Sequence, residues 1–435
     1  MLAAMPCVLL AAGCDSSRLV ADAVYLNGNI YTVDTRFSTA EAFAIKDGRF
    51  IYVGSNSGAG KRVGENTTVT DLEGRTVLPG LIDSHLHWRA GLEPRLLAVG
   101  LTGAHDANKA TMTSVERFKQ QYEAGELKIR LNVMLHTSTA FEMGQPEVGL
   151  FDHRLTFRAT KVHADNELGP RRAALFEEYS DRPGFYGPWG KHRLRPEVGG
   201  EDQESDYART VADLLRLGFQ PRTHAIGDFT NNLILNAYER ALTETGIRGK
   251  DARLVIEHSQ VLRREPVDDL VRFGRLGIIA NIQAIHATED MVWAEHRLGS
   301  ERVRLGYAWR DLLNTGAIIA GSSDYAVSPF NPWWGLHAAV TRQDRENQPP
   351  GGWFAHQALT REEALRSYTN WAAYAEFAED VKGSIEPGKL ADFIVIDRDY
   401  MTCPAEEIWQ IQVLNTVIGG EVVYPSSAPT AAPQQ

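Results

Sequence analysis

Short apolar runs alternate with stretches of helical periodicity through the middle of the chain. The runs have the length of buried strands, and the stretches between them are long enough to form crossover helices. This alternation is typical of a parallel α/β barrel, in which each strand is followed by a helix. The predicted strands span residues 77–84, 99–105, 128–136, 158–164, 219–224, 252–257, 276–282 and 317–322.

Both ends of the chain have a different texture, with short β-rich runs separated by turn pairs. Asn-Gly, Asp-Gly and Glu-Gly dipeptides divide the first of these regions, as in β-hairpins. The two regions are expected to pair into one small sandwich, which makes that domain discontinuous. The predicted fold class is therefore α/β, a (β/α)8 TIM-like barrel with a small β-sandwich formed by both termini. The predicted domains are a leader at 1–20, a sandwich at 21–77 plus 383–424, a barrel at 78–382 and a disordered tail at 425–435.

The first residues read MLAAMPCVLLAAGCDSS and resemble the lipobox of a bacterial lipoprotein signal. Cys14 would be the lipidated residue, although no Lys or Arg precedes the apolar run. On this interpretation the protein is exported, in the periplasm or anchored to a membrane by its lipid alone. Without such processing it would be cytoplasmic.

Composition narrows the kinds of partner. The 435 residues are 43% hydrophobic and 23% charged, as in a soluble globular protein, and the formal net charge of −11 argues against a nucleic-acid partner. Three cysteines are too few and too scattered for a disulfide framework or a thiolate metal site. Any metal chemistry must therefore rest on His, Asp, Glu and Lys.

The segment LPGLIDSHLH, at residues 78–87, carries the most specific signal. Side chains alternate along a strand, so His85 and His87 point the same way and can bind one ion. Pro79 and Gly80 mark the entry to the strand, and Asp83 is placed to orient an imidazole from behind.

Polar residues also follow several of the other predicted strands. The carboxyl ends of barrel strands meet at one mouth, where barrel enzymes collect their chemistry. Each of these residues alone is weak evidence, but their joint placement predicts a metal site. They are Lys161, His163, Asp165, His224, Asp228, His258 and Asp324.

In the order His-x-His, Lys, His, His, Asp, the chain resembles the amidohydrolase superfamily. The flanking sequence is similar to amidohydrolase family 3, the branch of N-substituted formamide deformylase-like enzymes. The resemblance runs from about residue 21 to 424. It rests on KVHADNELGPRRAALFEEYSDRPGFYG, THAIGD, IEHSQ, QAIHATEDMVWAEHRLG, GSSDYAVSPFNPWWGLHAAVTRQD and EEALRSYTNWAAYAEFAEDVKGSIEPGKLADFIVIDRD.

The resemblance implies a two-metal centre with zinc ions, or with manganese, iron or cobalt in their place. His85 and His87 would hold one ion and His224 and His258 the other. Lys161 would bridge them as a carbamate formed with CO2. Asp324 would bind the first ion and move a proton between a metal-bridged hydroxide and the leaving nitrogen.

The expected substrate is a small N-substituted amide, formamide or cyclic amide, cut at a C–N bond other than a peptide bond. Residues expected to contact it lie beside the metal motifs and are Trp88, His163, His286 and Tyr325. Core packing explains Trp88 equally well. Barrels of this kind often pair, so a homodimer is the assembly to consider.

Three alternatives stay open. In the first, one ion is bound by His85, His87, His224 and Asp324, as in deaminases, and Lys161 remains an amine. In the second, the same water activation serves an ester or a lactone. In the third, the chain is a non-catalytic exported binding protein on the same scaffold.

Two features depart from the family pattern. The strand carrying His85 is followed almost directly by the next one, where relatives have a long insertion, so the mouth should be more open. Asp165-Asn166-Glu167 replaces a common Asp-Gly pair and adds a carboxylate near Lys161. Both affect the substrate range and leave the metal positions intact.

Overall fold

The centre of the molecule is a nearly closed barrel of parallel strands, in a computed structural model that describes residues 19–425. Each strand pairs with the next, and a parallel bridge from Leu86 to Tyr325 joins the last to the first. The predicted fold class is confirmed. The barrel strands are β8 (Leu81–Leu86), β9 (Leu101–Ala110), β10 (Arg130–Leu135), β13 (Ala159–His163), β14 (Gln220–Ala225), β15 (Val255–His258), β16 (Ile279–Ile282) and β17 (Ile319–Gly321).

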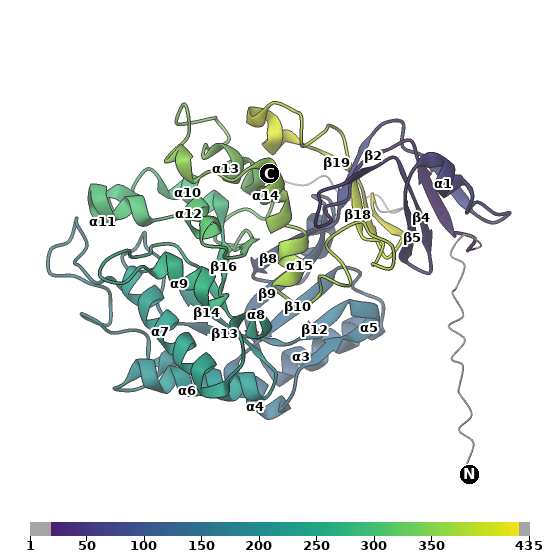
Figure 1. The fold of residues 1–435 in the computed structure, drawn as a ribbon. Coiled ribbons are helices and arrows are strands. Elements are labelled where there is room, and N and C mark those ends of the chain that lie inside the picture. The colour runs from purple at the N-terminus through teal and green to yellow at the C-terminus, as the bar shows by residue number, and fades with distance from the viewer. Residues whose placement is uncertain (1–18, 426–435) are drawn as a thin grey trace, which may run out of the picture.

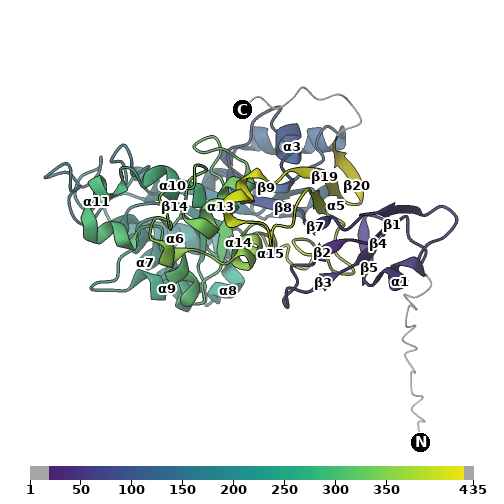
Figure 2. The ribbon, with the colours of Figure 1, turned by 90° about the horizontal axis from the view of Figure 1, so that it is seen from above.

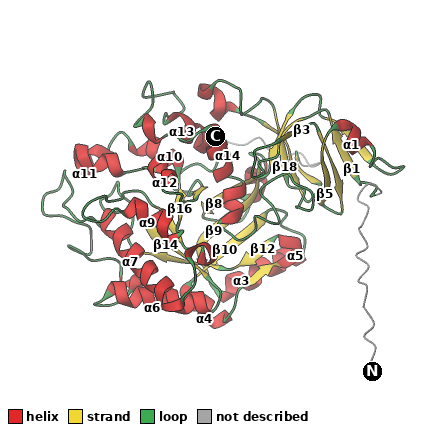
Figure 3. Cartoon of the chain, in the orientation of Figure 1, coloured by secondary structure: helices red, strands yellow, loops and turns green. Residues whose placement is uncertain are grey.

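Helices surround the barrel and bury its outer face (Figures 1 and 3). The helices from the barrel region are α2 (Glu93–Leu97), α3 (Met112–Glu123), α4 (Thr137–Met143), α5 (Leu150–His153), α6 (Gln203–Arg216), α7 (Asp228–Thr245), α8 (Gly249–Ala252), α9 (Asp269–Leu276), α10 (Ala284–Asp290), α11 (Ala294–Arg302), α12 (Trp309–Asn314), α13 (Pro332–Thr341), α14 (Arg361–Ser367) and α15 (Asn370–Tyr374). Short 3-10 turns lie at Pro196–Val198 (η2), Val303–Leu305 (η3), Ala355–Gln357 (η4) and Ala405–Gln410 (η5). Two further short strands, β11 (Glu147–Gly149) and β12 (Leu155–Phe157), extend the sheet beside β10.

Helix α6 shows how the sequence determines these elements. The Asp202 side chain accepts a hydrogen bond from the Ser205 amide and caps the first turn. Tyr207 and Val211, four residues apart, belong to its buried face. The helix therefore covers the barrel with one apolar stripe and leaves its charged side in water.

Two smaller sheets lie at one end of the molecule, where the first and last parts of the chain run side by side (Figures 1 and 2). The first and last parts of the chain both contribute strands to the second sheet, as expected for a domain formed by the two termini. In this sheet β18 (Phe393–Ile396), from the last part, pairs antiparallel with β7 (Thr76–Pro79), from the first. The first sheet contains β5 (Arg49–Gly54), β4 (Ala42–Lys46), β1 (Ala23–Leu26) and β6 (Thr68–Asp71), with helix α1 (Asn56–Gly60) beside it. The second contains β20 (Glu421–Tyr424), β19 (Val413–Ile418), β18 (Phe393–Ile396), β7 (Thr76–Pro79), β2 (Asn29–Tyr31) and β3 (Thr39–Ala40).

The single strand predicted over 77–84 is two strands that belong to different sheets. β7 pairs in the sandwich, and β8 begins the barrel after Gly80. A Cβ at Gly80 would lie 2.2 Å from Thr102 Oγ1, so only glycine allows this close approach to β9. Both strands are buried, so the sequence stays hydrophobic across this break and predicts a single strand.

A buried ion pair ties the barrel to the sandwich. Arg130, at the start of β10, donates from Nε and Nη2 to the two carboxylate oxygens of Asp392, at 2.6 and 2.9 Å. Asp392 also accepts a hydrogen bond from the Gly419 amide. Burial would raise the pKa of Asp392, but Arg130 holds that pKa below its usual value.

We expect Asp392→Asn to lower the free energy of unfolding by about 3 kcal/mol, because it leaves the buried Arg130 guanidinium without its counter-ion. Since the pKa of Asp392 is lowered on folding, its stabilisation is present above roughly pH 4 and is lost as the pH falls further. Urea unfolding followed by tryptophan fluorescence measures both effects. Asp22→Asn, which breaks the exposed pair with Lys46, is the matched control and should cost far less. Equal losses in the two variants would contradict the role of the buried pair.

The predicted leader with Cys14 and nearly all of the predicted tail lie outside the described residues. Among the residues that are described, no helix has both the length and the apolar character needed to cross a membrane.

Candidate metal centre

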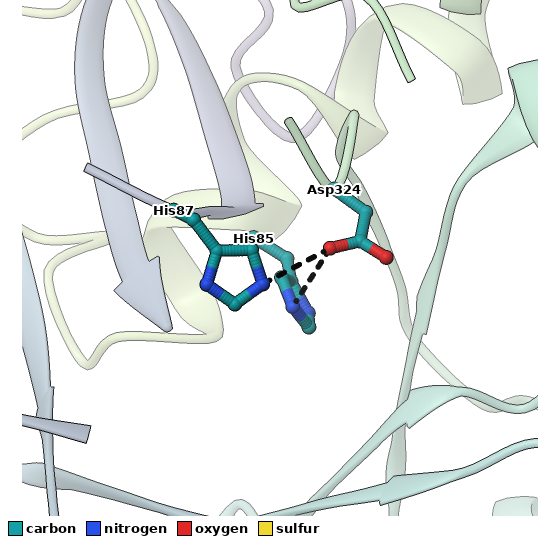
Figure 4. A group of neighbouring side chains, drawn as sticks. All are labelled: His85, His87 and Asp324. Carbon is teal, nitrogen blue, oxygen red and sulfur yellow. Dashed lines mark ion pairs between the residues drawn. The ribbon is translucent and has the colours of Figure 1, made fainter. Parts of the chain in front are cut away.

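The strand that opens the barrel and the loop that closes it bring two imidazoles and a carboxylate together. Asp324 Oδ1 lies 3.4 Å from His85 Nε2 and 3.3 Å from His87 Nε2 (Figure 4). The backbone fixes this arrangement, because the Asp324 amide donates to the His85 carbonyl and the His87 amide donates to the Tyr325 carbonyl. The hydrogen bonds that close the barrel thus also assemble the site.

Lys161 and two further histidines lie next to this group. The Lys161 side chain is fully buried in the barrel, and its Nζ is 3.2 Å from His85 Nε2. His258 Nε2 lies 2.9 Å from His224 Nδ1, and the His258 ring centre is 5.2 Å from that of His85. The six residues predicted as metal ligands therefore form one cluster at the carboxyl ends of the strands.

Hydrogen-bond partners fix the orientation of the imidazoles, and two of these partners, Glu257 and Gln283, are buried. His85 Nδ1 hydrogen-bonds to Glu257 Oε2 at 2.6 Å, and the other oxygen of Glu257 accepts from Arg222 Nε at 2.6 Å. His258 Nδ1 pairs with Gln283 Oε1 at 2.6 Å, and His87 Nδ1 pairs with Asn108 Oδ1 at 3.0 Å. In each case the other ring nitrogen is left facing the cluster, as in histidine metal ligands.

Asp83 has a different role from the one predicted. Its carboxylate accepts hydrogen bonds from the His85 amide and from the amide and hydroxyl of Ser323, so it contacts backbone and hydroxyl groups and leaves the imidazole to Glu257. The prediction that Asp83 orients an imidazole directly was wrong. Its side chain instead holds β8 against the segment that leads to Asp324.

Asp165 organises the loop between β14 and α7. Its carboxylate accepts from the amides of Ala174, Ile226 and Gly227 and from the Thr230 hydroxyl. A Cβ at Gly227 would lie 1.9 Å from the Ala174 carbonyl oxygen, so glycine is required there. His224 Nε2 lies 3.5 Å from the same carboxylate, so this loop packs directly against the cluster.

Burial lowers the pKa of three imidazoles of the cluster, those of His85, His224 and His258, and so favours their neutral form. Burial would also lower the pKa of His87, but the Asp324 carboxylate raises it above its usual value. Burial, with the neighbouring Lys161, lowers the pKa of His85 to about 4, and burial lowers the pKa of His258 to about 3. Burial would raise the pKa of Asp324, but the surrounding histidines hold it well below its usual range. Burial also lowers the pKa of Lys161 to about 8. Neutral imidazoles beside an anionic carboxylate are the protonation states that a divalent cation requires.

The donor atoms fit a metal ion. Two sets of three residues have their ligand atoms within 4.8 Å of one another: His85, His87 and Asp324, and His258, His286 and Asp324. His286 Nε2 is buried and has no hydrogen-bond partner among the described residues, and the same holds for His224 Nε2. His286 was predicted as a substrate contact, and the geometry also places it within reach of a metal.

A cavity of about 430 Å³ opens above the cluster. His163 and His286 line it, as predicted for substrate contacts. Trp88 packs in the hydrophobic core, and Tyr325 packs against that core with its ring 5.1 Å from Phe330. Neither is among the residues that line this cavity, so their predicted contact with substrate finds no support.

Several residues of the site were not singled out from the sequence. Glu257 precedes His258 in the IEHSQ motif, and the alternation of the strand turns it into the barrel behind His85. Arg195 and Glu197 come from a long loop whose path the sequence pattern does not give. Glu289 and Trp293 lie in the QAIHATEDMVWAEHRLG segment, where only His286 was considered.

The fold and the site together define a class: an α/β-barrel protein with a histidine–carboxylate metal centre at the carboxyl ends of its strands. The model of the amidohydrolase family matches residues 94–424. The chain belongs to the amidohydrolase family.

Relatives and solved structures agree with this assignment. The chain is 30% identical to the Bacillus subtilis protein YtcJ, named as an amidohydrolase, over 75% of this chain and 59% of that protein. It is 25% identical to an N-substituted formamide deformylase from Arthrobacter pascens, over 75% of this chain and 58% of that enzyme. The chain therefore spans less than two thirds of the length of these two relatives. The crystal structure of an uncharacterized metal-dependent hydrolase from Pyrococcus horikoshii shares the fold, with a TM-score of 0.75 at 21% identity over 88% of this chain and 99% of that one.

Proposed function

We propose that the protein is a metal-dependent hydrolase that cleaves a carbon–nitrogen bond other than a peptide bond in a small amide, formamide or cyclic amide. The observation that carries this proposal is the contact of Asp324 Oδ1 with Nε2 of both His85 and His87, on the floor of a cavity of about 430 Å³. The similarity to an N-substituted formamide deformylase supports the type of bond. A cavity of this size suits a small molecule.

The ligand set proposed for two ions is His85 and His87 for the first, His224 and His258 for the second, and Lys161 as a carbamate between them. Asp324 completes the first site. When bound, such ions acidify water and polarise a carbonyl group. Carbamate formation requires the neutral amine, and the burial of Lys161 favours that form.

Asp324 is the proposed acid and base. Its carboxylate is anionic at neutral pH and faces the cavity, so it can take a proton from the attacking water and deliver it to the leaving nitrogen. His286 lies beside it on the cavity wall and is placed to donate a hydrogen bond to the substrate carbonyl.

A centre with one metal ion is the second candidate, and the contact between Lys161 and His85 favours it. Lys161 Nζ lies within hydrogen-bond distance of His85 Nε2, as an unmodified amine would. A centre with one ion, held by His85, His87, His224 and Asp324, leaves Lys161 in that state. The number of ions per chain separates the two arrangements.

We expect hydrolysis of N-benzylformamide to depend on a divalent metal. Protein dialysed against a chelator should lose at least about 90% of the formate release. Addition of Zn²⁺ should restore it, because neutral imidazoles are good ligands for this ion. Release of formate and amine is measured by chromatography, with phenyl acetate as the ester comparison. Full activity after complete metal removal would contradict the proposal, as would turnover of the ester alone.

A further inference from the structure

One wall of the cavity carries two cationic side chains. Lys109 lies at the end of β9, next to the Asn108 that contacts His87, and Arg195 immediately precedes η2. Both line the cavity, and their side chains are 26% and 31% exposed. Both side chains are partly buried, so an anion beside them is favourable.

The two cations share a single carboxylate. Glu197 accepts from Lys109 Nζ at 3.1 and 3.3 Å, and Arg195 Nη2 lies 3.8 Å from it. Lys109 and Arg195 are among the residues that line this cavity, whereas Glu197 is not. Lys109 and Arg195 therefore exceed the charge of Glu197 by one, and Glu167, next to the Asn166 that accepts from Arg195 Nη1, is a further carboxylate on the cavity lining.

Another part of the cavity lining is acidic, and its carboxylates already have hydrogen-bond donors. Glu289 accepts from the Ser328 hydroxyl, and Asp290 accepts from Tyr307 Oη and from Gln260 Nε2 at 3.1 Å. Both acids line the cavity. An anionic group on a ligand would be repelled from this side and attracted to the other.

We propose that Lys109 and Arg195 form a subsite for the carboxylate of the substrate, which makes the substrate class N-acyl amino acids or similar amides that carry a carboxylate. When the carboxylate of the substrate binds to Lys109 and Arg195, its amide would lie over the cluster of His85, His87 and Asp324. Arg195 supplies a planar fork that matches a carboxylate, and Lys109 supplies a point charge. The substrate assignment rests on the proposed hydrolytic function, whereas the anion subsite itself does not require turnover.

Two substrates of nearly equal size test the subsite: N-formylglycine, which carries a carboxylate, and N-formylglycinamide, which is neutral. We expect the wild-type protein to favour N-formylglycine by about 10- to 100-fold in kcat/KM, the range of hydrogen bonds between charged groups. Arg195→Gln and Lys109→Gln should each reduce this preference by about 10-fold, mainly through the KM of N-formylglycine. Arg209→Gln, on the solvent-exposed side of helix α6 and outside the cavity, is the matched control and should keep the preference.

Calorimetric binding of the same two compounds to the metal-loaded protein separates the two proposals. Binding of N-formylglycine that weakens in the Arg195 and Lys109 variants would support the subsite, even if neither compound is hydrolysed. In that case the subsite would stand and only the hydrolytic function would be contradicted. Hydrolysis of both compounds without preference would overturn the subsite and leave the hydrolytic function standing. A preference that persists in both variants would also overturn it.

Discussion

Replacing Asp324 by asparagine is expected to lower kcat by about 1,000-fold or more, which is the largest effect we predict. The change removes the negative charge and the proton acceptor while it keeps the shape of the side chain. A positioned acid–base group contributes roughly 100- to 10,000-fold, and Asp324 is proposed to act both on the attacking water and on the leaving nitrogen. Steady-state kinetics with N-benzylformamide measure the loss.

The backbone at Asp324 makes asparagine the appropriate substitution. Its φ is 55°, in the left-handed region that asparagine adopts more readily than most residues. Asp251→Asn, on the surface helix α8, is the matched control and should retain activity. If Asp324→Asn keeps more than about a tenth of the wild-type kcat with an unchanged melting temperature, the acid–base role is wrong.

Replacing Lys161 by methionine is expected to lower kcat by about 100- to 1,000-fold and to reduce the metal content by about one ion per chain. The Lys161 side chain is fully buried in the cluster. Lysine side chains are normally exposed to solvent, so a buried one indicates a specific role. Methionine has a similar length and is apolar, so it fills the space without supplying anionic oxygens. The expected loss follows because a second ion would have lost its bridging ligand.

Elemental analysis of the Lys161→Met protein, together with its kinetics, checks this prediction. In a second variant, Lys161→Ala, the space is left open, so added acetate, which supplies carboxylate oxygens, should recover part of the activity. Lys128→Met, an exposed lysine that pairs with Glu421 on the surface, is the control. An unchanged metal content in Lys161→Met would favour the arrangement with one ion.

The positions of the barrel strands could be predicted because the signal is local. Each strand is a short apolar run with polar residues at its end, and the sequence alone contains that pattern. The break at Gly80 could not be predicted, since it depends on the approach of Thr102 from β9. Local hydrophobicity gives the strands, whereas the sheet to which each one belongs depends on contacts between distant segments.

The same distinction applies to the site. His85, His87 and Asp324 follow predicted strands, and strand-end residues of a barrel converge at one mouth. The contact between His85 and Glu257 joins residues 172 positions apart, so no local pattern could assign the partner, and Asp83 was chosen because it is near in sequence. Lys109, Arg195 and Glu197 come together only through the folded loop before η2.

The most direct test of the central claim is the metal content of the protein purified without chelator, measured by elemental mass spectrometry. We predict about two divalent ions per chain, one at His85 and His87 and one at His224 and His258. A content near one ion that does not respond to Lys161→Met or to added bicarbonate would contradict the two-metal centre. A protein that binds no metal and hydrolyses no amide after reconstitution would contradict the proposed function itself.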